Sequence, residues 1–284
     1  MLELASASGE WQLGYGGDTL NTAIHLARAE IDTAFLTALG SDPFSADLRD
    51  KWRTEGLDTG LVLDHPARTA GLYAITTDPQ GERSFTYWRD NSAARAMFEC
   101  PGIDSALSRA ESAELLVFSL ITLAILPPEG REQLLDLARR FRERGGRVAF
   151  DGNYRPRLWT SLQEAQAARD AAIGCATIGL PTLEDEVAMT GAQSAAQVAE
   201  HWQGLGCAET VIKLGAEGCL LPGGQLITPA QVLAPLDTSG AGDAFNAGYL
   251  AARLRGADLA QSARAGHELA GWTIMRPGAI PVRD

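Results

Sequence analysis

An alternation of short apolar runs with amphipathic stretches, between residues 115 and 214, constrains the fold of this chain more than any other feature. Each apolar run is interpreted as a buried strand and each amphipathic stretch as a helix. The predicted strands are Leu115–Ile121, Arg147–Asp151, Ala176–Gly179 and Thr210–Leu214, and the predicted helices are Pro128–Glu143, Leu162–Gly174, Leu183–Thr190 and Ala195–Leu205. Strands and helices in this order predict an α/β fold with a mostly parallel central sheet that helices cover on both faces.

One segment, Thr69–Arg89, departs from this alternation. It indicates two strands rich in Tyr, Thr, Phe and Trp around a turn at Asp78-Pro79-Gln80-Gly81. We interpret it as a small β lid over an active site that spans residues 67–92, with residues 11–16 as a candidate further part. The α/β core then consists of residues 1–66 and 93–284. A plainer alternative is an edge hairpin that has no role in binding.

Composition excludes several functional classes. The formal net charge of -12 at pH 7 argues against nucleic acid and anionic membranes as partners, because both require basic patches. The four cysteines and four histidines are scattered and show no C-x-x-C or H-E-x-x-H spacing, so a transition-metal site is not expected. No apolar run reaches the about 18 residues of a membrane-spanning helix, so we expect a cytoplasmic protein.

The stretch Leu236–Leu254 carries the clearest sign of chemistry, and it reads L-D-T-S-G-A-G-D-A-F-N-A-G-Y-L-A-A-R-L. From Ala244 onward it has helical periodicity, and residues 237–239 precede the helix as candidate N-cap oxygens. A first turn built from residues 240–242 exposes backbone N–H groups at the positive end of the helix dipole, which suits a phosphate group. The carboxylate of Asp243 would lie beside that phosphate. For a bare G-A-G-D, a capped helix with glycines for close packing is the plainer alternative.

The full string D-T-S-G-A-G-D-A-F resembles the signature of the PfkB (ribokinase-like) carbohydrate kinases. The resemblance implies a ribokinase-like three-layer sandwich with a mostly parallel central sheet and a small β lid. It also implies phosphoryl transfer from ATP with Mg²⁺, with Asp243 as the catalytic base. The γ-phosphate would be held by the backbone amides of Gly240, Ala241 and Gly242. Because phosphoryl transfer depends mainly on positioning and charge neutralisation, a base, an amide-lined turn and a metal ion are sufficient.

The same resemblance implies where the nucleotide binds. The segment from Lys213 through Gly215 to Gly218 is similar to the K-x-G-x-x-G turn that lines the nucleotide phosphates in this family, although alone it could be a tight turn between strands. These three residues and Thr238 are the implied ATP contacts. Asp185 stands where the family has the Glu of N-x-x-E, and a threonine replaces the Asn, so Asp185 is the candidate metal ligand. No Walker G-x-x-x-x-G-K-[ST] motif is present.

A second set of motifs concerns the phosphate acceptor. The string G-G-D-T-L-N-T-A at residues 16–23 begins an apolar helix, and its glycines permit close approach of a ligand. Together with G-E-R-S-F-T-Y-W-R at residues 81–89 and D-G-N-Y-R-P-R-L-W at residues 151–159, it is most similar to the 2-keto-3-deoxygluconate kinases of the PfkB family. The substrate contacts that this resemblance implies are Gly17, Asp18, Asn21, Tyr73, Tyr87, Arg89 and Arg155.

The arginines suit a sugar acid. An arginine can form a bidentate, charge-assisted pair with the carboxylate of such a substrate, and a neutral sugar does not need this pair. Arg89, at the end of the lid hairpin, and Arg155, after a strand, are expected to converge on that carboxylate. Tyr73 and Tyr87 are expected to share one lid face with Arg89, although ordinary strand packing is an alternative role for both tyrosines. The implied reaction converts the terminal hydroxyl of 2-keto-3-deoxygluconate to the 6-phosphate.

Two other functions stay open on the sequence alone. One is another PfkB-type kinase that acts on fructose, ribose or a nucleoside. The other is a non-catalytic sugar-binding homologue, which would have no need of Asp243 or of the G-A-G turn. In each case an exposed lid hairpin favours a homo-oligomer that pairs through the lid.

The beginning of the sequence departs from the family pattern. Met1-Leu2-Glu3-Leu4 resembles the residues that follow the opening strand of these kinases, and that strand is not present. A parallel sheet without it is expected to have unpaired backbone groups and an apolar trough.

Overall fold

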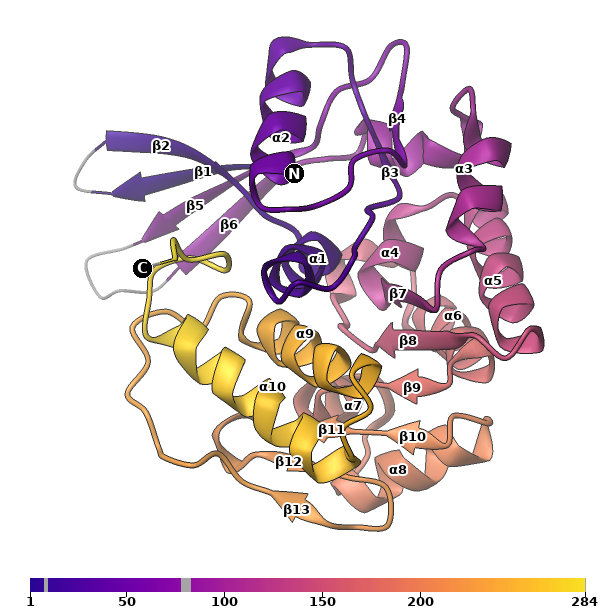
Figure 1. Ribbon diagram of the computed structural model, residues 1–284, viewed down its shortest axis with the longest axis vertical. Helices are drawn as coiled ribbons and strands as arrows, with labels where there is room; N and C mark the ends of the chain where they lie inside the picture. Colours follow the sequence, from indigo (N-terminus) through magenta and orange to yellow (C-terminus); the bar gives the residue numbers. More distant parts are fainter. Residues whose placement is uncertain (8–9, 78–82, 284) are drawn as a thin grey trace.

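A four-stranded parallel sheet forms the centre of the molecule (Figure 1). The structure is a computed structural model that describes residues 1–7, 10–77 and 83–283. The strands follow the order β10-β9-β8-β7, and every neighbouring pair is parallel. These strands are β7 (Leu115–Ser119), β8 (Arg147–Asp151), β9 (Ile178–Gly179) and β10 (Glu209–Thr210).

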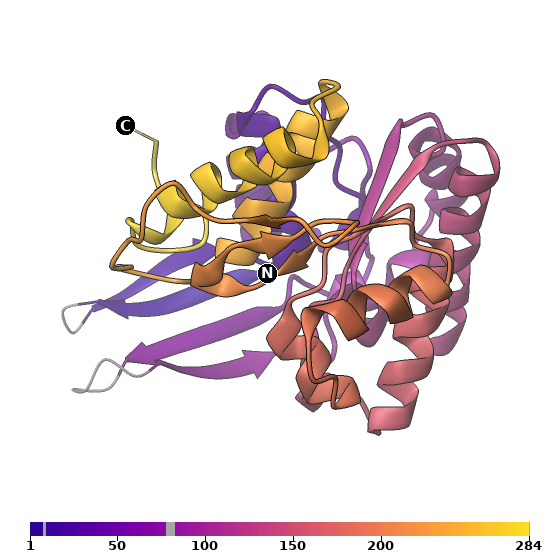
Figure 2. The same ribbon diagram turned by 90° about the horizontal axis from the view of Figure 1, so that it is seen from below.

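β8 shows how one strand supports two cores, because successive side chains of a strand point to opposite faces. Val148 and Phe150 belong to one apolar cluster with α5, α6 and α8, whereas Ala149 belongs to a second cluster with α1, α9 and α10. The protein therefore has the three layers that the sequence predicts (Figure 2). The covering helices are α1 (Asp18–Arg28), α5 (Pro128–Glu143), α6 (Leu162–Cys175), α8 (Ala195–Gly204), α9 (Ala241–Leu254) and α10 (Leu259–Ile274). Within the described ranges, none of the helices is long and apolar enough to cross a membrane.

α9 and α10 pack so closely that two glycines are required between them. A Cβ atom at Gly248 would lie 2.5 Å from the carbonyl oxygen of Ala265, and one at Gly266 would lie 2.8 Å from the ring of Phe245. Neither backbone can move aside without separating the helices. The position of α9 is thus fixed from behind by α10.

A second sheet carries the predicted hairpin and extends to one side of the core (Figure 1). Its strand order is β2-β1-β5-β6, and we call it the lid sheet. The predicted turn at residues 78–81 lies outside the described residues. Most of residues 11–16, the candidate further part of the lid, lie in β2. β1 also belongs to the lid sheet, which differs from the prediction that residues 1–10 belong to the core. The strands are β1 (Leu2–Ala7), β2 (Glu10–Tyr15), β5 (Leu72–Thr77) and β6 (Arg83–Trp88).

Three predicted strands differ from the structure, and the simplest difference is at Ala176–Gly179, where β9 is only Ile178–Gly179. Leu115–Ile121 is too long, because Ser119 caps α4: its hydroxyl accepts from the amide of Thr122, and the Thr122 hydroxyl accepts from the amide of Ser119. Thr210–Leu214 is wrong as a single strand. Its first residue pairs with β9, whereas Ile212 and Lys213 form β11 of a separate antiparallel sheet with the order β11-β12-β13.

Shorter elements complete the described chain. A parallel pair, β3 with β4, lies beside the core. The remaining helices are α2 (Pro43–Thr54), α3 (Ile103–Ala110), α4 (Leu120–Ile125) and α7 (Leu183–Thr190), with 3-10 turns at η1 (Ala93–Glu99), η2 (Pro156–Leu158) and η3 (Gly215–Glu217). The remaining strands are β3 (Thr37–Leu39), β4 (Val62–Asp64), β11 (Ile212–Lys213), β12 (Cys219–Leu220) and β13 (Leu226–Ile227).

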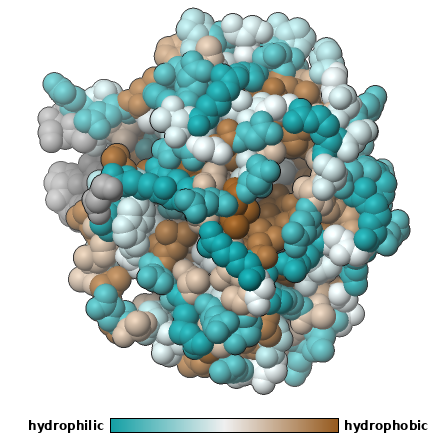
Figure 3. Space-filling view, viewed as in Figure 1, coloured by the Kyte–Doolittle hydropathy of each residue, from teal (hydrophilic) through white to brown (hydrophobic). Residues whose placement is uncertain are grey.

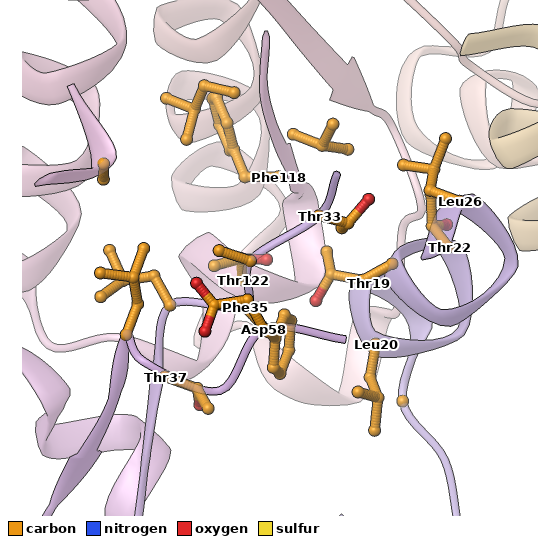
Figure 4. Close-up of a pocket in the computed structure, with 18 of the residues that line it drawn as sticks. Thr19, Leu20, Thr22, Leu26, Thr33, Phe35, Thr37, Asp58, Phe118 and Thr122 are labelled. Atoms are coloured by element: carbon orange, nitrogen blue, oxygen red, sulfur yellow. The ribbon is translucent and has the colours of Figure 1, made fainter. Parts of the chain in front are cut away.

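An apolar groove separates the β3–β4 pair from the central sheet. In the described part of the chain β3 pairs only with β4, and β7 pairs only with β8. Among the described residues, β3 and β7 therefore each have one unpaired edge. The cavity between them has a volume of about 840 Å³, and Leu20, Leu26, Phe35 and Phe118 are among the residues that line it (Figure 4). Apolar side chains are also visible in a hollow near the middle of this face of the molecule (Figure 3). Met1 lines the groove as well.

Candidate active site

The amino end of α9 carries Asp243 into the interior of the protein. Asp243 is 8% exposed, and its carboxylate accepts a hydrogen bond of 2.8 Å from the side-chain amide of Asn21 in α1. The hydroxyl of Thr22 donates to the backbone carbonyl of Asp243 over 3.2 Å. α1 therefore holds both the backbone and the side chain of Asp243 in place.

The turn before Asp243 differs from the predicted capped helix start. Gly240 is the N-cap residue in the left-handed conformation, with φ of 69°, and no side chain caps the helix. The carboxylate of Asp237 accepts instead from the amides of Ser239 and Gly278, at 2.9 and 2.7 Å. A Cβ atom at Gly240 would lie 2.6 Å from that of Ala279, so this position requires glycine for space as well as for φ. No side chain caps this end of α9, and the amide of Ala241 donates to the carbonyl oxygen of Thr238 over 3.3 Å, so an anion at this end would compete with that contact.

The environment of Asp243 favours its protonated form. The pKa of Asp243 is raised to about 8, mainly by burial and also by the charges of Asp18 and Asp151. The hydrogen bond from Asn21 and the charge of Lys213 act in the opposite direction. A carboxyl group with a pKa near neutrality inside a site is suited to accept a proton from a hydroxyl group.

Lys213 lies directly behind the amino end of α9. Its ammonium group donates to Asp151 and to the side-chain oxygen of Asn246, each over 3.1 Å. The side-chain amide of Asn246 in turn donates to Asp151 over 2.8 Å. A Cβ atom at Gly242 would lie 3.6 Å from the Lys213 nitrogen. The sequence predicts Lys213 as an ATP contact, and the structure places its charge next to the predicted phosphate position.

The other predicted ATP contacts differ in exposure: Gly215 and Thr238 are exposed, and Gly218 is buried. Gly215 has a φ of 60° and begins the turn η3, and Gly218 ends it with a φ of 115°. A side chain at Gly218 would collide with the carbonyl oxygen of Ile227, since its Cβ atom would lie 2.1 Å away. Thr238 is exposed, and its carbonyl oxygen accepts from the amide of Ala241.

The start of α1 meets the site from the opposite side. Gly17 has a φ of 152° and precedes the helix, and its amide donates to the side chain of Asn21 over 3.2 Å. The Asp18 carboxylate accepts from the hydroxyl of Ser119, and burial raises the pKa of Asp18. Asn21 therefore links the glycine turn to Asp243, and Asp18 lies close enough to Asp243 to affect its pKa.

One face of the lid sheet carries the predicted aromatic residues. Tyr73 in β5 lies opposite Tyr87 in β6, with ring centroids 6.0 Å apart. The guanidinium of Arg89 lies over the Tyr87 ring, 4.2 Å from its centroid. The Tyr73 hydroxyl donates to Glu3, and burial raises the pKa of Tyr73. The three predicted lid residues thus do share one face.

The charge of Asp18 acts on Arg89, and the charge of Arg155 acts on Asp18. The negative charge of Asp18 counteracts the burial that lowers the pKa of Arg89, and the positive charge of Arg155 counteracts the burial that raises the pKa of Asp18. Two arginines from separate elements are thus electrostatically coupled to one buried acid. Arg155 is also paired with Asp185 at 3.3 Å.

Asp185 lies in the first turn of α7. Its carboxylate accepts from the amide of Tyr154 over 3.3 Å, and burial raises its pKa. Asp151 also raises it, so the two carboxylates are near one another. Within the described residues, no group of three or more His, Cys, Asp or Glu side chains could hold a metal ion. Asp185 alone fits Mg²⁺, which proteins hold with one or two carboxylates while phosphates and water supply the other ligands.

The structure adds Asp151, Asn246, Ser119 and Glu3 to the residues that the sequence singles out. Asp151 opens the D-G-N-Y-R string at the end of β8, and Asn246 follows Asp243 by three residues on α9. A polar residue at the carboxyl end of a parallel strand, and a polar residue one helical turn after a base, were the available signals. Ser119 and Glu3 gave no comparable signal in the sequence.

A buried carboxyl group beside an uncapped helix start, in a three-layer α/β sandwich with a β lid, defines a site for phosphoryl transfer to a hydroxyl group. The chain matches the pfkB family of carbohydrate kinases over residues 2–284, and it belongs to this family. It is 40% identical over 294 residues to 2-dehydro-3-deoxygluconokinase of Escherichia coli (strain K12), and the match covers 100% of this chain and 95% of the relative. The enzyme of that name from Dickeya dadantii (strain 3937) is 39% identical over 290 residues, covering 99% of this chain and 94% of the relative.

Solved structures agree with the fold. Fructokinase from Vibrio cholerae O395, with fructose, ADP and calcium ion bound, superimposes with a TM-score of 0.84 at 26% identity and covers 98% of this chain and 91% of that one. A PfkB protein from Polaromonas sp. JS666 gives a TM-score of 0.85 at 24% identity, covering 99% and 94%. The predicted ribokinase-like sandwich with a small β lid is confirmed.

Proposed function

We propose that this protein is an ATP-dependent kinase that phosphorylates the terminal hydroxyl of 2-keto-3-deoxygluconate, also called 2-dehydro-3-deoxygluconate, to the 6-phosphate. The observation that carries this proposal is that Arg89 and Arg155 are both electrostatically coupled to the buried Asp18, whose charge also acts on Asp243. Two cations can bind the carboxylate of a sugar acid while Asp243 faces its hydroxyl group. Relatives with this activity in their names share up to 40% of their residues with the chain.

Asp243 acts as the base in this mechanism. Its carboxylate takes the proton of the substrate hydroxyl while the hydroxyl oxygen attacks the γ-phosphorus, and the bond from that phosphorus to the β,γ-bridging oxygen breaks to release ADP. The amides of Gly240, Ala241 and Gly242 stabilise the charge on the transferring group. Lys213, Gly215, Gly218 and Thr238 bind the nucleotide. Because Asp243 must be ionised to accept the proton, the rate should rise with pH through its pKa, which is about 8 before substrates bind.

The sugar acid occupies the space between α1 and the lid sheet in this proposal. Gly17 and Asn21 present polar groups of the α1 start, and Asp18 binds a substrate hydroxyl while Arg89 and Arg155 turn to the carboxylate. Tyr73 and Tyr87 cover the substrate from the lid and exclude water, which limits hydrolysis of ATP.

Mg²⁺ is the metal that we propose for this site. It would neutralise charge on the phosphates of ATP, and Asp185 is the side chain that we assign to it, directly or through water. Asp185 would exchange its contact with Arg155 for the metal, which would free the arginine for the substrate.

A coupled assay for ADP release tests the proposed function. Mg·ATP is supplied with 2-keto-3-deoxygluconate, fructose, ribose or adenosine, and the Asp243→Asn variant is the control. Turnover of the keto-deoxy acid alone, lost in the variant, supports the substrate and the base together. Turnover of a neutral sugar with no use of the acid would refute the role of the two arginines and leave the base intact.

A neutral-sugar kinase is the second candidate, since fructokinase of Vibrio alginolyticus is 30% identical over 86% of this chain. The third is a non-catalytic sugar-binding homologue, and no turnover of any substrate by folded protein would favour it. A kinase that consumes ATP works where ATP is present, so we place the protein in the cytoplasm.

We also propose that the protein forms a homo-oligomer through the lid sheet. The face opposite Tyr73 and Tyr87 exposes Trp11, Leu13 and Trp88, by 55%, 40% and 57%. A second copy that covers these side chains would remove apolar surface from water. Light scattering of the protein and of a Trp11→Ser variant tests this, and a monomeric wild-type protein would contradict it.

Finally, we propose that the groove between β3 and β7 receives a further parallel strand, which would complete the core at residues 1–66 and 93–284. Two unpaired strand edges and an apolar lining support this proposal. The amino group of Met1 is buried in the same place, and burial lowers its pKa to about 6. Joining a seven-residue, valine-rich extension to Met1 should raise the melting temperature, and an unchanged value would contradict the proposal.

A further inference from the structure

Three buried side chains behind the amino end of α9 form a closed ring of hydrogen bonds. Lys213 donates to Asp151 and Asn246, and Asn246 donates to the second oxygen of Asp151. Their exposed fractions are 7% for Lys213, 7% for Asp151 and 2% for Asn246. They come from β11, β8 and α9, so the ring forms only when three distant segments meet.

The ring fixes the direction of the Lys213 ammonium. Such a group has three N–H donors, and Asp151 and Asn246 accept two of them. The nitrogen lies next to Gly242, where a Cβ atom would be 3.6 Å away. Gly242 thus leaves open the side on which the first turn of α9 presents its amides. A lysine side chain in water samples many rotamers, so two fixed acceptors are required to keep the charge in one place.

We propose that Asp151 and Asn246 are positioning residues that hold the Lys213 ammonium against the amino end of α9, so that it neutralises charge on the transferring phosphoryl group. This inference rests on the proposed function, because it assigns the phosphoryl group to that end of the helix. Asp151 and Asn246 touch neither substrate, and they act through Lys213. The charge of the lysine and the amides of residues 240–242 then act on the same group from two sides.

The ring also connects the phosphate position to the base. The charged or titratable groups that affect Asp243 come from every element around it: Asp18 from α1, Asp151 from β8, Lys213 from β11 and Tyr73 from the lid sheet. Asp151 raises the pKa of Asp243 and Lys213 lowers it. Changes in the two members of the ion pair should therefore move the pH dependence of the reaction in opposite directions.

The experiment compares Lys213→Met, Asp151→Asn and Asn246→Ser with the wild-type protein. We expect kcat to fall on the order of 100-fold for Lys213→Met, as when one donor to the transition state is lost. For Asp151→Asn and Asn246→Ser we expect a fall of about 10- to 100-fold, as for residues that orient another group. The KM for the sugar acid should change less than threefold, because the ring lies on the phosphate side.

The pH profile of kcat/KM separates positioning from simple stabilisation of the fold. The acidic limb should move to lower pH in Asp151→Asn and to higher pH in Lys213→Met, and it should stay in place in Asn246→Ser. A matched control is Glu209→Gln, which breaks the partly buried pair of Glu209 with Arg253 at the far end of α9. It should lower the melting temperature and leave kcat and the pH profile unchanged.

The outcomes decide the two proposals separately. Asp151→Asn and Asn246→Ser proteins that fold and retain wild-type kcat would overturn the positioning role, and so would equal losses in Glu209→Gln. If wild-type protein turns over only a neutral sugar, the proposed substrate fails and the same variants are compared on that sugar. If it turns over nothing, calorimetric binding of Mg²⁺ with a non-hydrolysable ATP analogue decides. Affinities equal to wild type in all three variants would then overturn the inference, and a loss of about fivefold or more would support it.

Discussion

At the amino end of α9, Asp243 is 8% exposed and hydrogen-bonded to Asn21, whereas on the lid sheet Tyr87 is 44% exposed and its ring contacts Tyr73 and Arg89. Asp243 is held by α1 and faced by the ring of Lys213, Asp151 and Asn246. Arg89, by contrast, rests on the ring of Tyr87. The groups around Asp243 are already held by hydrogen bonds without substrate. The lid residues Tyr87 and Arg89 contact each other, and they would have to rearrange to contact a substrate.

This difference indicates a division of labour. Chemistry benefits from groups that need no reorganisation at the moment of reaction, and these are buried and hydrogen-bonded. Substrate entry requires a surface that can open, and such surfaces have fewer buried contacts. Substitutions near Asp243 should therefore affect kcat, and substitutions on the lid should affect KM.

The largest effect is expected for Asp243→Asn. Loss of the base should lower kcat by about 10³-fold.

The same variant should change how stability depends on pH. Folding raises the pKa of Asp243 from 3.8 to about 8, so between these pH values the folded protein keeps a proton that the unfolded chain releases. The stability of the wild-type protein therefore decreases as pH rises from about 4 to about 8, and the Asn variant lacks this loss. Its melting temperature should exceed that of the wild type by a margin that grows from pH 5 to pH 8 and is constant above; a margin independent of pH would contradict the buried charge.

A smaller effect, confined to substrate binding, is expected for Arg89→Ala. A hydrogen-bonded pair with a carboxylate contributes about 1.5–3 kcal/mol, so kcat/KM for the sugar acid should fall about 10- to 100-fold, mostly through KM. Arg139→Ala is the control, since Arg139 is an exposed residue of α5 that pairs with Asp136. Equal losses for the acid and for a neutral sugar would show that Arg89 does not recognise the carboxylate.

The support of the preformed region is tested by Gly248→Ala. The added methyl group collides with the carbonyl of Ala265, and such overpacking costs about 1–3 kcal/mol. The melting temperature should fall by several degrees, and kcat should fall with it because α9 moves. Gly204→Ala at the end of α8 is the control, since a Cβ there meets no atom within 4 Å, and it should be neutral or slightly stabilising.

The smallest effect is expected for Tyr73→Phe. The variant keeps the ring contact with Tyr87 and loses the hydrogen bond to Glu3, which contributes about 1 kcal/mol. Steady-state kinetics should show a rise in KM of about threefold with little change in kcat. A fall in kcat of more than tenfold would instead place the phenol in the chemical step.

Local patterns predicted the parts of the fold that local chemistry determines. The bounds of α5 and β8 agree with the prediction to the residue, because apolar periodicity sets both. The split between β10 and β11 was missed, because Thr210 pairs with β9 whereas Lys213 pairs with β12, and apolar periodicity does not carry this difference in pairing. In the site, the motif around Asp243 predicted its place beside a helix start. The ring of Asp151 and Asn246 was not predicted, because their contact joins residues 95 positions apart.

The groove between β3 and β7 gives the protein a distinctive response to hydrostatic pressure. Pressure favours states of smaller volume, and internal empty space is volume that unfolding or hydration removes. A groove of about 840 Å³ lies against α1 and β7, whereas α9 and α10 are in close contact with each other at Gly248 and Gly266. Compression should therefore loosen the β3–β4 pair first and leave the helix that carries Asp243 folded to higher pressure.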